Sequence, residues 1–296
     1  MIAVMGATGN TGRAVVDRLL DAGRKVRVIG RSPDRLKRFV DRGAEPISGD
    51  ASDAAVLTSA LSGADAVYAM VPPDYGQPDP RAYYNRFGET IEKAARQSGV
   101  RRIVFLSSVG AELASGTGPI AGLHDVEERL KTLGVDLRIL RPGYFYDNFF
   151  TNLGLIRHQR INGGAIAPLV PIPMTDTGDI GAAAADELAN GRFTGTTVRE
   201  LLGPRDYTMK EATAMIGQKI GMPDLPYIQF QDADVVGALT QAGISNGVAA
   251  SFVEMSHALS EGRVRSLQGR TAETTMATPF EAFADRFAAA FKAQGS

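Results

Sequence analysis

The chain opens with MIAVMGATGNTG (residues 1–12), an apolar run that leads directly into a glycine-rich turn. Glycine in such a turn lets the backbone approach a pyrophosphate, and a helix that starts there offers unpaired N–H groups and partial positive charge to the phosphates. We therefore expect a strand over Ile2–Met5, a helix from Asn10 and a dinucleotide bound between them. A tight turn that binds no ligand is the alternative interpretation.

The first half of the chain repeats this pattern of short apolar runs and helical segments. Strands are predicted at Ile2–Met5, Lys25–Ile29, Glu45–Ser48, Ala66–Met70, Arg102–Leu106 and Asp136–Leu140. Helices are predicted to begin near Asn10, Pro33, Asp53, Asp79 and Gly122 and to stop at Gly23, Gly43, Gly63, Gly99 and Gly134. Such alternation indicates βαβ units. The sequence predicts an α/β fold with a Rossmann-type doubly wound parallel sheet.

The residue after the second predicted strand indicates which dinucleotide binds. An NAD-specific site carries an acidic residue there to bind the ribose 2′-hydroxyl, whereas this chain has Gly30-Arg31-Ser32. Arg31 offers a cation to a 2′-phosphate, and Arg35, one helical turn later, offers a second. We therefore expect NADP(H) as the cofactor. Ordinary surface charges are the alternative for both arginines.

Three further positions are expected at the same edge of the sheet. Asp50 follows the third strand, where it can meet the adenine edge or, alternatively, cap a helix. Val71 and Pro72 follow the fourth strand, in the crevice where α/β sheets bind ligands. The residues predicted to bind NADP(H) are Gly6, Ala7, Thr8, Gly9, Asn10, Thr11, Gly12, Arg31, Arg35, Asp50, Val71, Pro72 and Ser107.

The regular alternation ends after the sixth strand, so a second region is expected. Asp179–Asn190 is rich in alanine, and small residues let a helix pack closely on a sheet, so we expect this segment to return to the first domain. The expected division is an NADP-binding Rossmann domain at 1–145, to which 176–203 returns, and a smaller, interleaved α+β substrate or partner region at 146–296, mainly 146–175 and 204–296.

The composition excludes several kinds of site. The 296 residues are 44% hydrophobic with a net charge of −1, which suits a packed core and gives no basic surface for nucleic acid. The chain has no cysteine, which excludes disulfides and thiolate metal sites, and we predict no metal site. No leader pattern or long apolar run is present, so we expect a cytoplasmic protein with no membrane partner. The oligomeric state is left open.

Two later segments carry a family resemblance. Ser107-Ser108 ends the fifth strand, and residues 140–148 read LRPGYFYDN after the sixth. With these segments and the amino-terminal glycines, almost the whole chain resembles the NmrA-like family of atypical short-chain dehydrogenases. The resemblance implies an extended Rossmann fold that prefers NADP(H). It also implies a relation to quinone oxidoreductases, azoreductases, isoflavone-type reductases, or redox sensors that bind cofactor without turnover.

The usual proton donor of short-chain dehydrogenases is missing. Those enzymes combine a serine with Tyr-x-x-x-Lys, in which the tyrosine passes a proton to a carbonyl oxygen. No tyrosine of this chain has a lysine at that spacing; His124 and Glu128 stand at the expected place. An imidazole pKa near 6.5 suits His124 to proton donation, although a place in the first turn of a helix explains the residue equally.

Two further side chains complete the predicted catalytic set of His124, Ser107 and Tyr144. Ser107 is positioned to hydrogen-bond a substrate carbonyl or, alternatively, nearby backbone groups. Tyr144 follows the Pro142-Gly143 turn and is a second candidate proton donor.

These patterns favour an NADPH-dependent oxidoreductase that transfers hydride to a quinone-like, azo or carbonyl small molecule. Two other functions remain open. One is a regulatory protein that senses NADP(H) and binds a protein partner, a hypothesis suggested by the missing tyrosine–lysine pair. The other is an enzyme that catalyses a non-redox reaction, such as an isomerisation, on the same fold.

Overall fold

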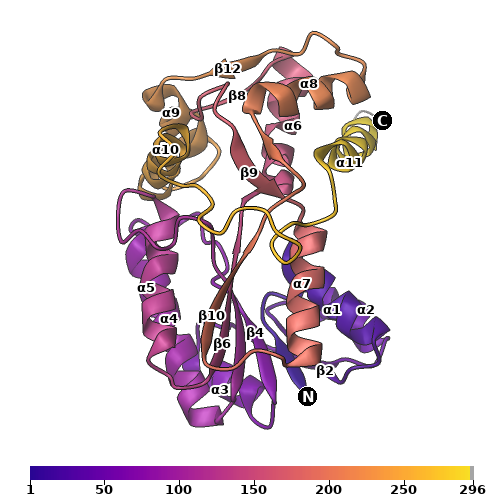
Figure 1. Ribbon diagram of the computed structural model, residues 1–296, viewed down its shortest axis with the longest axis vertical. Helices are drawn as coiled ribbons and strands as arrows, with labels where there is room; N and C mark the ends of the chain where they lie inside the picture. Colours follow the sequence, from indigo (N-terminus) through magenta and orange to yellow (C-terminus); the bar gives the residue numbers. More distant parts are fainter. Residues whose placement is uncertain (294–296) are drawn as a thin grey trace.

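A seven-stranded parallel sheet forms the centre of the molecule (Figure 1) in the computed structural model, which describes residues 1–293. Its order is β10-β6-β5-β4-β1-β2-β3. The strands are β1 (Ile2–Val4), β2 (Val26–Gly30), β3 (Glu45–Ser48), β4 (Ala66–Ala69), β5 (Arg102–Leu106), β6 (Asp136–Pro142) and β10 (Thr196–Leu201). The strand order reverses between β1 and β4, which is the point where doubly wound sheets bind ligands. The predicted Rossmann-type fold is confirmed.

Helices cover both faces of this sheet because successive strand residues point to opposite sides. One face carries α1 (Asn10–Asp21), α2 (Pro33–Val40) and α7 (Thr177–Asn190); the other carries α3 (Ala54–Leu61), α4 (Pro80–Ser98) and α5 (Pro119–Lys131). In β1, Val4 packs with Val15 and Ile180 on the first face, while Ala3 packs with Ile91 on the second. The sheet is therefore buried on both sides.

Local signals set most helix ends. The Asp53 carboxylate accepts hydrogen bonds from the amides of the first turn of α3, and Gly99 ends α4 in the left-handed conformation. The expected start of α5 near Gly122 is wrong, because the helix begins at Pro119, where proline is pre-organised for the first helical position. His124 consequently lies in the second turn of α5 rather than the first.

The rest of the chain forms a smaller α+β region next to the carboxyl edge of the sheet (Figure 1). Its elements are β7 (Tyr144–Phe145), the 3-10 helix η1 (Tyr146–Asn152), α6 (Leu153–Gln159), β8 (Asn162–Gly164), β9 (Ile172–Thr175), β11 (Asp206–Tyr207), α8 (Met209–Ile220), β12 (Tyr227–Gln229), α9 (Asp232–Gln241), α10 (Asn246–Ser260) and α11 (Phe280–Ala293). Three phenylalanines of α11, Phe280, Phe283 and Phe287, are fully buried in its core.

Two segments link this region to the large sheet. Helix α7 packs on α1, where Gly181 lies directly against Ala14, and β10 adds a parallel edge strand beside β6. The chain thus leaves the sheet after β6 and comes back to it through α7 and β10. Within residues 1–293, no helix combines the length and the apolar character needed to cross a bilayer.

Candidate functional site

The glycine turn after β1 leaves an open backbone cradle. Gly6 has a φ of +62°, and a Cβ atom on Gly12 would lie 2.2 Å from the Gly6 carbonyl oxygen, so the turn and α1 can approach only without side chains. Helix α1 has Gly9 as its N-cap, no side-chain cap and no acidic residue in its first turn. Its amino-terminal N–H groups and dipole are therefore available to a phosphate.

A cavity of about 980 Å³ runs along the carboxyl edge of the sheet from this turn. Seven of the predicted cofactor residues line it: Gly6, Thr8, Gly9, Arg31, Arg35, Asp50 and Pro72. We call this cavity the cofactor cleft. Ala7, Thr11 and Gly12 are instead buried behind the turn, where the Thr11 hydroxyl oxygen accepts a hydrogen bond from Tyr68 at 3.0 Å. Asn10 lines a neighbouring hollow and donates to Asp147 at 3.2 Å.

The charged wall of the cofactor cleft is organised by Arg31 and Arg35. Arg35 donates to the Thr8 carbonyl at 3.1 Å and so braces the glycine turn. A hydrogen bond from the Ser52 amide is the largest influence that lowers the pKa of the Asp50 carboxyl, and the nearby charge of Arg31 acts in the same direction. Asp50 does not cap α3, because Asp53 holds that position.

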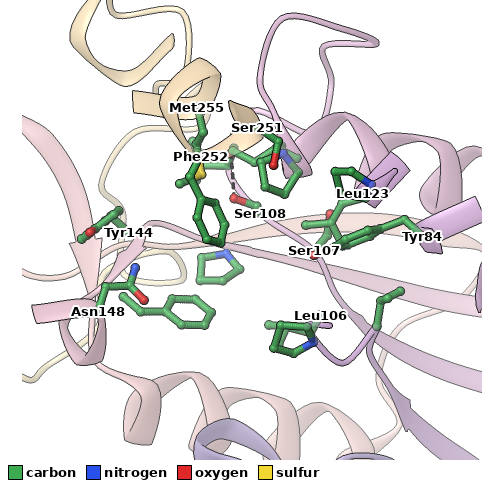
Figure 2. A pocket seen from close by; sticks show the side chains of 18 of the residues that line it. Tyr84, Leu106, Ser107, Ser108, Leu123, Tyr144, Asn148, Ser251, Phe252 and Met255 are labelled. Atoms are coloured by element: carbon green, nitrogen blue, oxygen red, sulfur yellow. Dashed lines mark hydrogen bonds between the residues drawn. The ribbon is translucent and has the colours of Figure 1, made fainter. Parts of the chain in front are cut away.

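An apolar pocket of about 290 Å³ adjoins the cofactor cleft (Figure 2). Five residues line both cavities: Met70, Pro73, Asp74, Tyr75 and Tyr83. The other walls come from the ends of β5 and β6, from α5 and from α10, which contributes Phe252 and Met255. The predicted residues Val71, Ser107 and Tyr144 all line this pocket. We call it the acceptor pocket.

Tyrosines supply hydroxyl groups to the acceptor pocket. Burial raises the pKa of Tyr144 to about 12, with an opposing contribution from its hydrogen bond with Asn148. Burial likewise raises the pKa of Tyr83 to about 12, and its hydroxyl donates to the Pro72 carbonyl at 2.9 Å. Both phenols therefore keep their protons at neutral pH.

The structure does not bring His124 together with Ser107 and Tyr144. His124 lies in a surface hollow lined also by Asn85, Asp125 and Glu128, whereas the preceding residue of α5, Leu123, faces the acceptor pocket. Its Nδ1–H donates to the Ala111 carbonyl at 2.8 Å, since a carbonyl oxygen can only accept. The role predicted for His124 has no contact in this pocket to support it.

A buried charged cluster beneath Ser107 was not anticipated from the sequence. Glu127 on α5 is completely buried; it accepts a hydrogen bond from Ser107 and two from the guanidinium of Arg141. The remaining Nη1 of Arg141 donates to Glu112 at 2.9 Å. The sequence pattern around Glu127 is typical of a solvated helix face. Only the tertiary contacts of Glu127 show that it is a buried charge beneath Ser107.

The chain is similar to known proteins over nearly its whole length. The profile of the NmrA-like family matches residues 1–278. A (4-alkanoyl-5-oxo-2,5-dihydrofuran-3-yl)methyl phosphate reductase from Streptomyces griseus is 31% identical, over 98% of this chain and 99% of that protein. An NAD(P)H azoreductase from Xenophilus azovorans is 26% identical, over 99% of this chain and 100% of that protein.

A solved structure shares the same architecture. The NADPH complex of an NADPH-dependent quinone oxidoreductase from Escherichia coli superimposes with a TM-score of 0.82 at 23% sequence identity. The match covers 97% of this chain and 99% of that one. A family match that spans both regions, together with a relative at 31% identity over nearly the full length, settles the resemblance seen in the sequence. This chain belongs to the NmrA-like family.

Proposed function

We propose that this chain is an NADPH-dependent oxidoreductase that reduces an uncharged, apolar small molecule such as a quinone-like, azo or carbonyl compound. The observation that carries the proposal is the wall shared by the cofactor cleft and the acceptor pocket, to which Met70 and Tyr83 belong. Two cavities with a common wall let a bound cofactor and a second small molecule lie next to each other, as direct hydride transfer requires.

The residues of the cofactor cleft fit NADP(H). The cradle of Gly6, Gly9 and Gly12 suits the pyrophosphate, and Arg31 suits the 2′-phosphate because a guanidinium forms charge-assisted hydrogen bonds with phosphate oxygens. Reduced cofactor supplies the hydride, so the chain itself needs no redox-active group. NADPH in the related quinone oxidoreductase complex supports the same assignment.

The lining of the acceptor pocket favours uncharged substrates. Among the described residues that line it, Asp74 is the only one with a charged side chain, and it lies on the shared wall. A phosphate or carboxylate buried there would have no cation to pair with, which is energetically costly. The Streptomyces relative carries a phosphate ester in its name, so we propose that this chain differs from it in substrate.

Tyr144 is the proton donor that we propose for this pocket. It lines the acceptor pocket, and a phenol with a pKa of about 12 holds its proton at neutral pH until negative charge develops on a neighbouring oxygen or nitrogen. The apolar walls from α5 and α10 exclude water and so strengthen any hydrogen bond that this hydroxyl makes to the substrate.

The decisive test is the loss of NADPH absorbance when the purified chain meets matched acceptors, with NADH run in parallel. We expect turnover with 1,4-naphthoquinone and little turnover with 1,4-naphthoquinone-2-sulfonate, which differs by one negative charge. Calorimetry measures cofactor binding separately. NADPH binding without turnover of any quinone, azo dye or aldehyde would favour a cofactor sensor, and a product formed at constant absorbance would favour a non-redox enzyme.

A further inference from the structure

The Ser107 hydroxyl donates its proton to the carboxylate of Glu127. Its oxygen lies 2.5 Å from Oε1 of Glu127. Both oxygens of that carboxylate also accept from Arg141, Oε1 from Nε at 2.9 Å and Oε2 from Nη2 at 2.6 Å. An ionised carboxylate has no proton to give, so the bond between the two side chains uses the proton of Ser107.

Arg141 is the ion-pair partner of Glu127. Burial of the guanidinium lowers its pKa, but the hydrogen bonds and charge of Glu127, with a further contribution from Glu112, outweigh burial and raise the pKa above its usual value. This permanently charged guanidinium donates one hydrogen bond to each oxygen of the Glu127 carboxylate. Ser107 therefore faces a fixed acceptor, and the orientation of its hydroxyl is set from within the protein.

Toward a ligand, the Ser107 hydroxyl can therefore only accept a hydrogen bond. Its hydroxyl proton is committed to Glu127, and its amide donates to the Leu140 carbonyl at 2.8 Å. A ligand in the acceptor pocket can therefore meet only the lone pairs of the hydroxyl oxygen. This differs from the sequence-based expectation that Ser107 donates to a substrate carbonyl. A carbonyl oxygen placed against this serine would meet lone pairs.

We propose that Glu127, acting through Ser107, holds a hydrogen-bond acceptor for the N–H₂ group of the nicotinamide carboxamide. The inference rests on the proposed NADPH-dependent function. Quinone, azo and carbonyl groups accept hydrogen bonds, whereas the carboxamide is the donor at the reactive end of NADP(H). Ser107 directly follows β5, which is separated from β1 and its glycine turn by β4 alone, at about 5 Å per strand. In this assignment Ser107 contacts the cofactor and Glu127 is a positioning residue.

A pair of ligands tests the direction of this hydrogen bond. In 3-acetylpyridine adenine dinucleotide phosphate, a methyl ketone replaces the carboxamide of NADP⁺, so the C=O is kept and the N–H donor is lost. We expect wild-type protein to bind NADP⁺ about tenfold more tightly than the analogue in calorimetry. Ser107→Ala should remove this preference, because the variant has no acceptor to offer.

Ser108→Ala is the matched control for this comparison. Ser108 also lines the acceptor pocket (Figure 2), but its hydroxyl donates to the Val109 carbonyl at 2.9 Å instead of to Glu127. The control should keep the full preference for NADP⁺. Equal affinities of the wild type for both ligands, or an unchanged preference in Ser107→Ala, would overturn the assignment.

A second pair of variants tests the role of Glu127. Glu127→Gln replaces one acceptor oxygen by an N–H₂ group and should reduce the preference for NADP⁺ over the analogue by several-fold. Glu112→Gln changes only the outer partner of Arg141 and should leave the preference intact. A Glu127→Gln variant that binds with the wild-type preference would contradict the positioning role. If that variant fails to fold, the Ser107→Ala comparison still decides the direction of the bond.

The outcome also separates this inference from the proposed function. If neither NADP⁺ nor NADPH binds to wild-type protein, the proposed function itself fails. If both bind and support turnover while the two ligands of the test pair bind equally, only the assignment of Ser107 and Glu127 fails.

Discussion

We propose that cofactor choice depends on the side chain of Arg31. Arg31 lines the cofactor cleft, and its positive charge helps to lower the pKa of the nearby Asp50 carboxyl. We expect Arg31→Glu to weaken NADPH binding by about ten- to a hundred-fold, because a charge-assisted hydrogen bond contributes roughly 1.5–3 kcal/mol. NADH, which has no 2′-phosphate, should bind almost as before, and calorimetry with both cofactors measures the difference.

The same charge reversal on α2, outside the cofactor cleft, is the control for this prediction. Lys37 is exposed and pairs with Asp41 on the surface, outside the cofactor cleft. Lys37→Glu should leave NADPH binding within about twofold of wild type, since exposed charges in water interact weakly. If Arg31→Glu and Lys37→Glu weaken both cofactors to the same degree, the 2′-phosphate is not bound by Arg31.

His124 is expected to have a structural role only. Its ring bonds to the Ala111 carbonyl and lies outside the acceptor pocket. We expect His124→Ala to lose about 1 kcal/mol of stability with the lost hydrogen bond and to change turnover by less than about tenfold. Loss of a general acid costs about 10² to 10⁴ in rate, and we expect such a loss in Tyr144→Phe. If His124→Ala slows turnover more than Tyr144→Phe in steady-state kinetics, His124 and not Tyr144 is the proton donor.

At the scale of elements, the contact between α1 and α7 depends on one glycine. A Cβ atom on Gly181 would lie 2.3 Å from the Cβ of Ala14, well inside van der Waals contact. We expect Gly181→Ala to destabilise the fold by about 1–3 kcal/mol in urea unfolding, because the helices must move apart. Since α7 carries the chain back to the large sheet, the loss should appear in global unfolding.

At Gly237 in α9, where a side chain would have free space, we expect alanine to raise stability instead of lowering it. A Cβ on Gly237 in α9 would meet no atom within 4 Å, so Gly237→Ala should stabilise the protein by up to about 1 kcal/mol through helix propensity. An equal loss of stability in both variants would contradict close packing at Gly181 as the cause, because Gly237 has no such contact.

The elements were predictable wherever the deciding information is local. The strand at Glu45–Ser48 was predicted with its observed bounds, since Gly43 and Gly49 mark turns on either side of it. Strand β6 extends to Pro142, beyond the expected Leu140, because it pairs with β10 as far as Leu201. That partner comes from a distant part of the chain, and no local pattern announces it.

Only the local parts of the site could likewise be predicted from the sequence. The glycine turn is a local structure, so its place and its glycines could be read from the sequence. The cluster of Ser107, Glu127 and Arg141 could not, because it joins three elements and depends on burial that the polar stretch around Glu127 conceals. The wall from α10 was also missed, since Phe252 and Met255 reach the pocket only through the tertiary fold.

At the scale of the whole molecule, the loop between β4 and α4 fastens the two regions together. The amide of Ser245 donates to the Tyr75 carbonyl at 2.8 Å, and its hydroxyl donates to the Gln77 carbonyl at 2.5 Å. Ser245 is also the N-cap of α10. The same loop lines both the cofactor cleft and the acceptor pocket, so the start of α10 holds the shared wall in place.

Loosening this attachment should affect both ligands. We expect Ser245→Ala to raise hydrogen exchange over residues 73–79 and to weaken binding of NADPH and of the acceptor together, each by several-fold. Thr208→Ala removes the N-cap of α8, which lies away from this loop, at a similar local cost of about 1 kcal/mol. This control should leave exchange over 73–79 unchanged; an equal rise in both variants would point to general destabilisation.

The shared wall also has a kinetic consequence. Because Met70, Pro73 and Tyr83 border both cavities, a molecule bound in the cofactor cleft would complete the surface that the acceptor contacts. We therefore expect the acceptor to bind only after the nucleotide and the oxidised nucleotide to leave last. Steady-state data should follow a compulsory-order sequential mechanism, with intersecting double-reciprocal lines and NADP⁺ competing with NADPH alone.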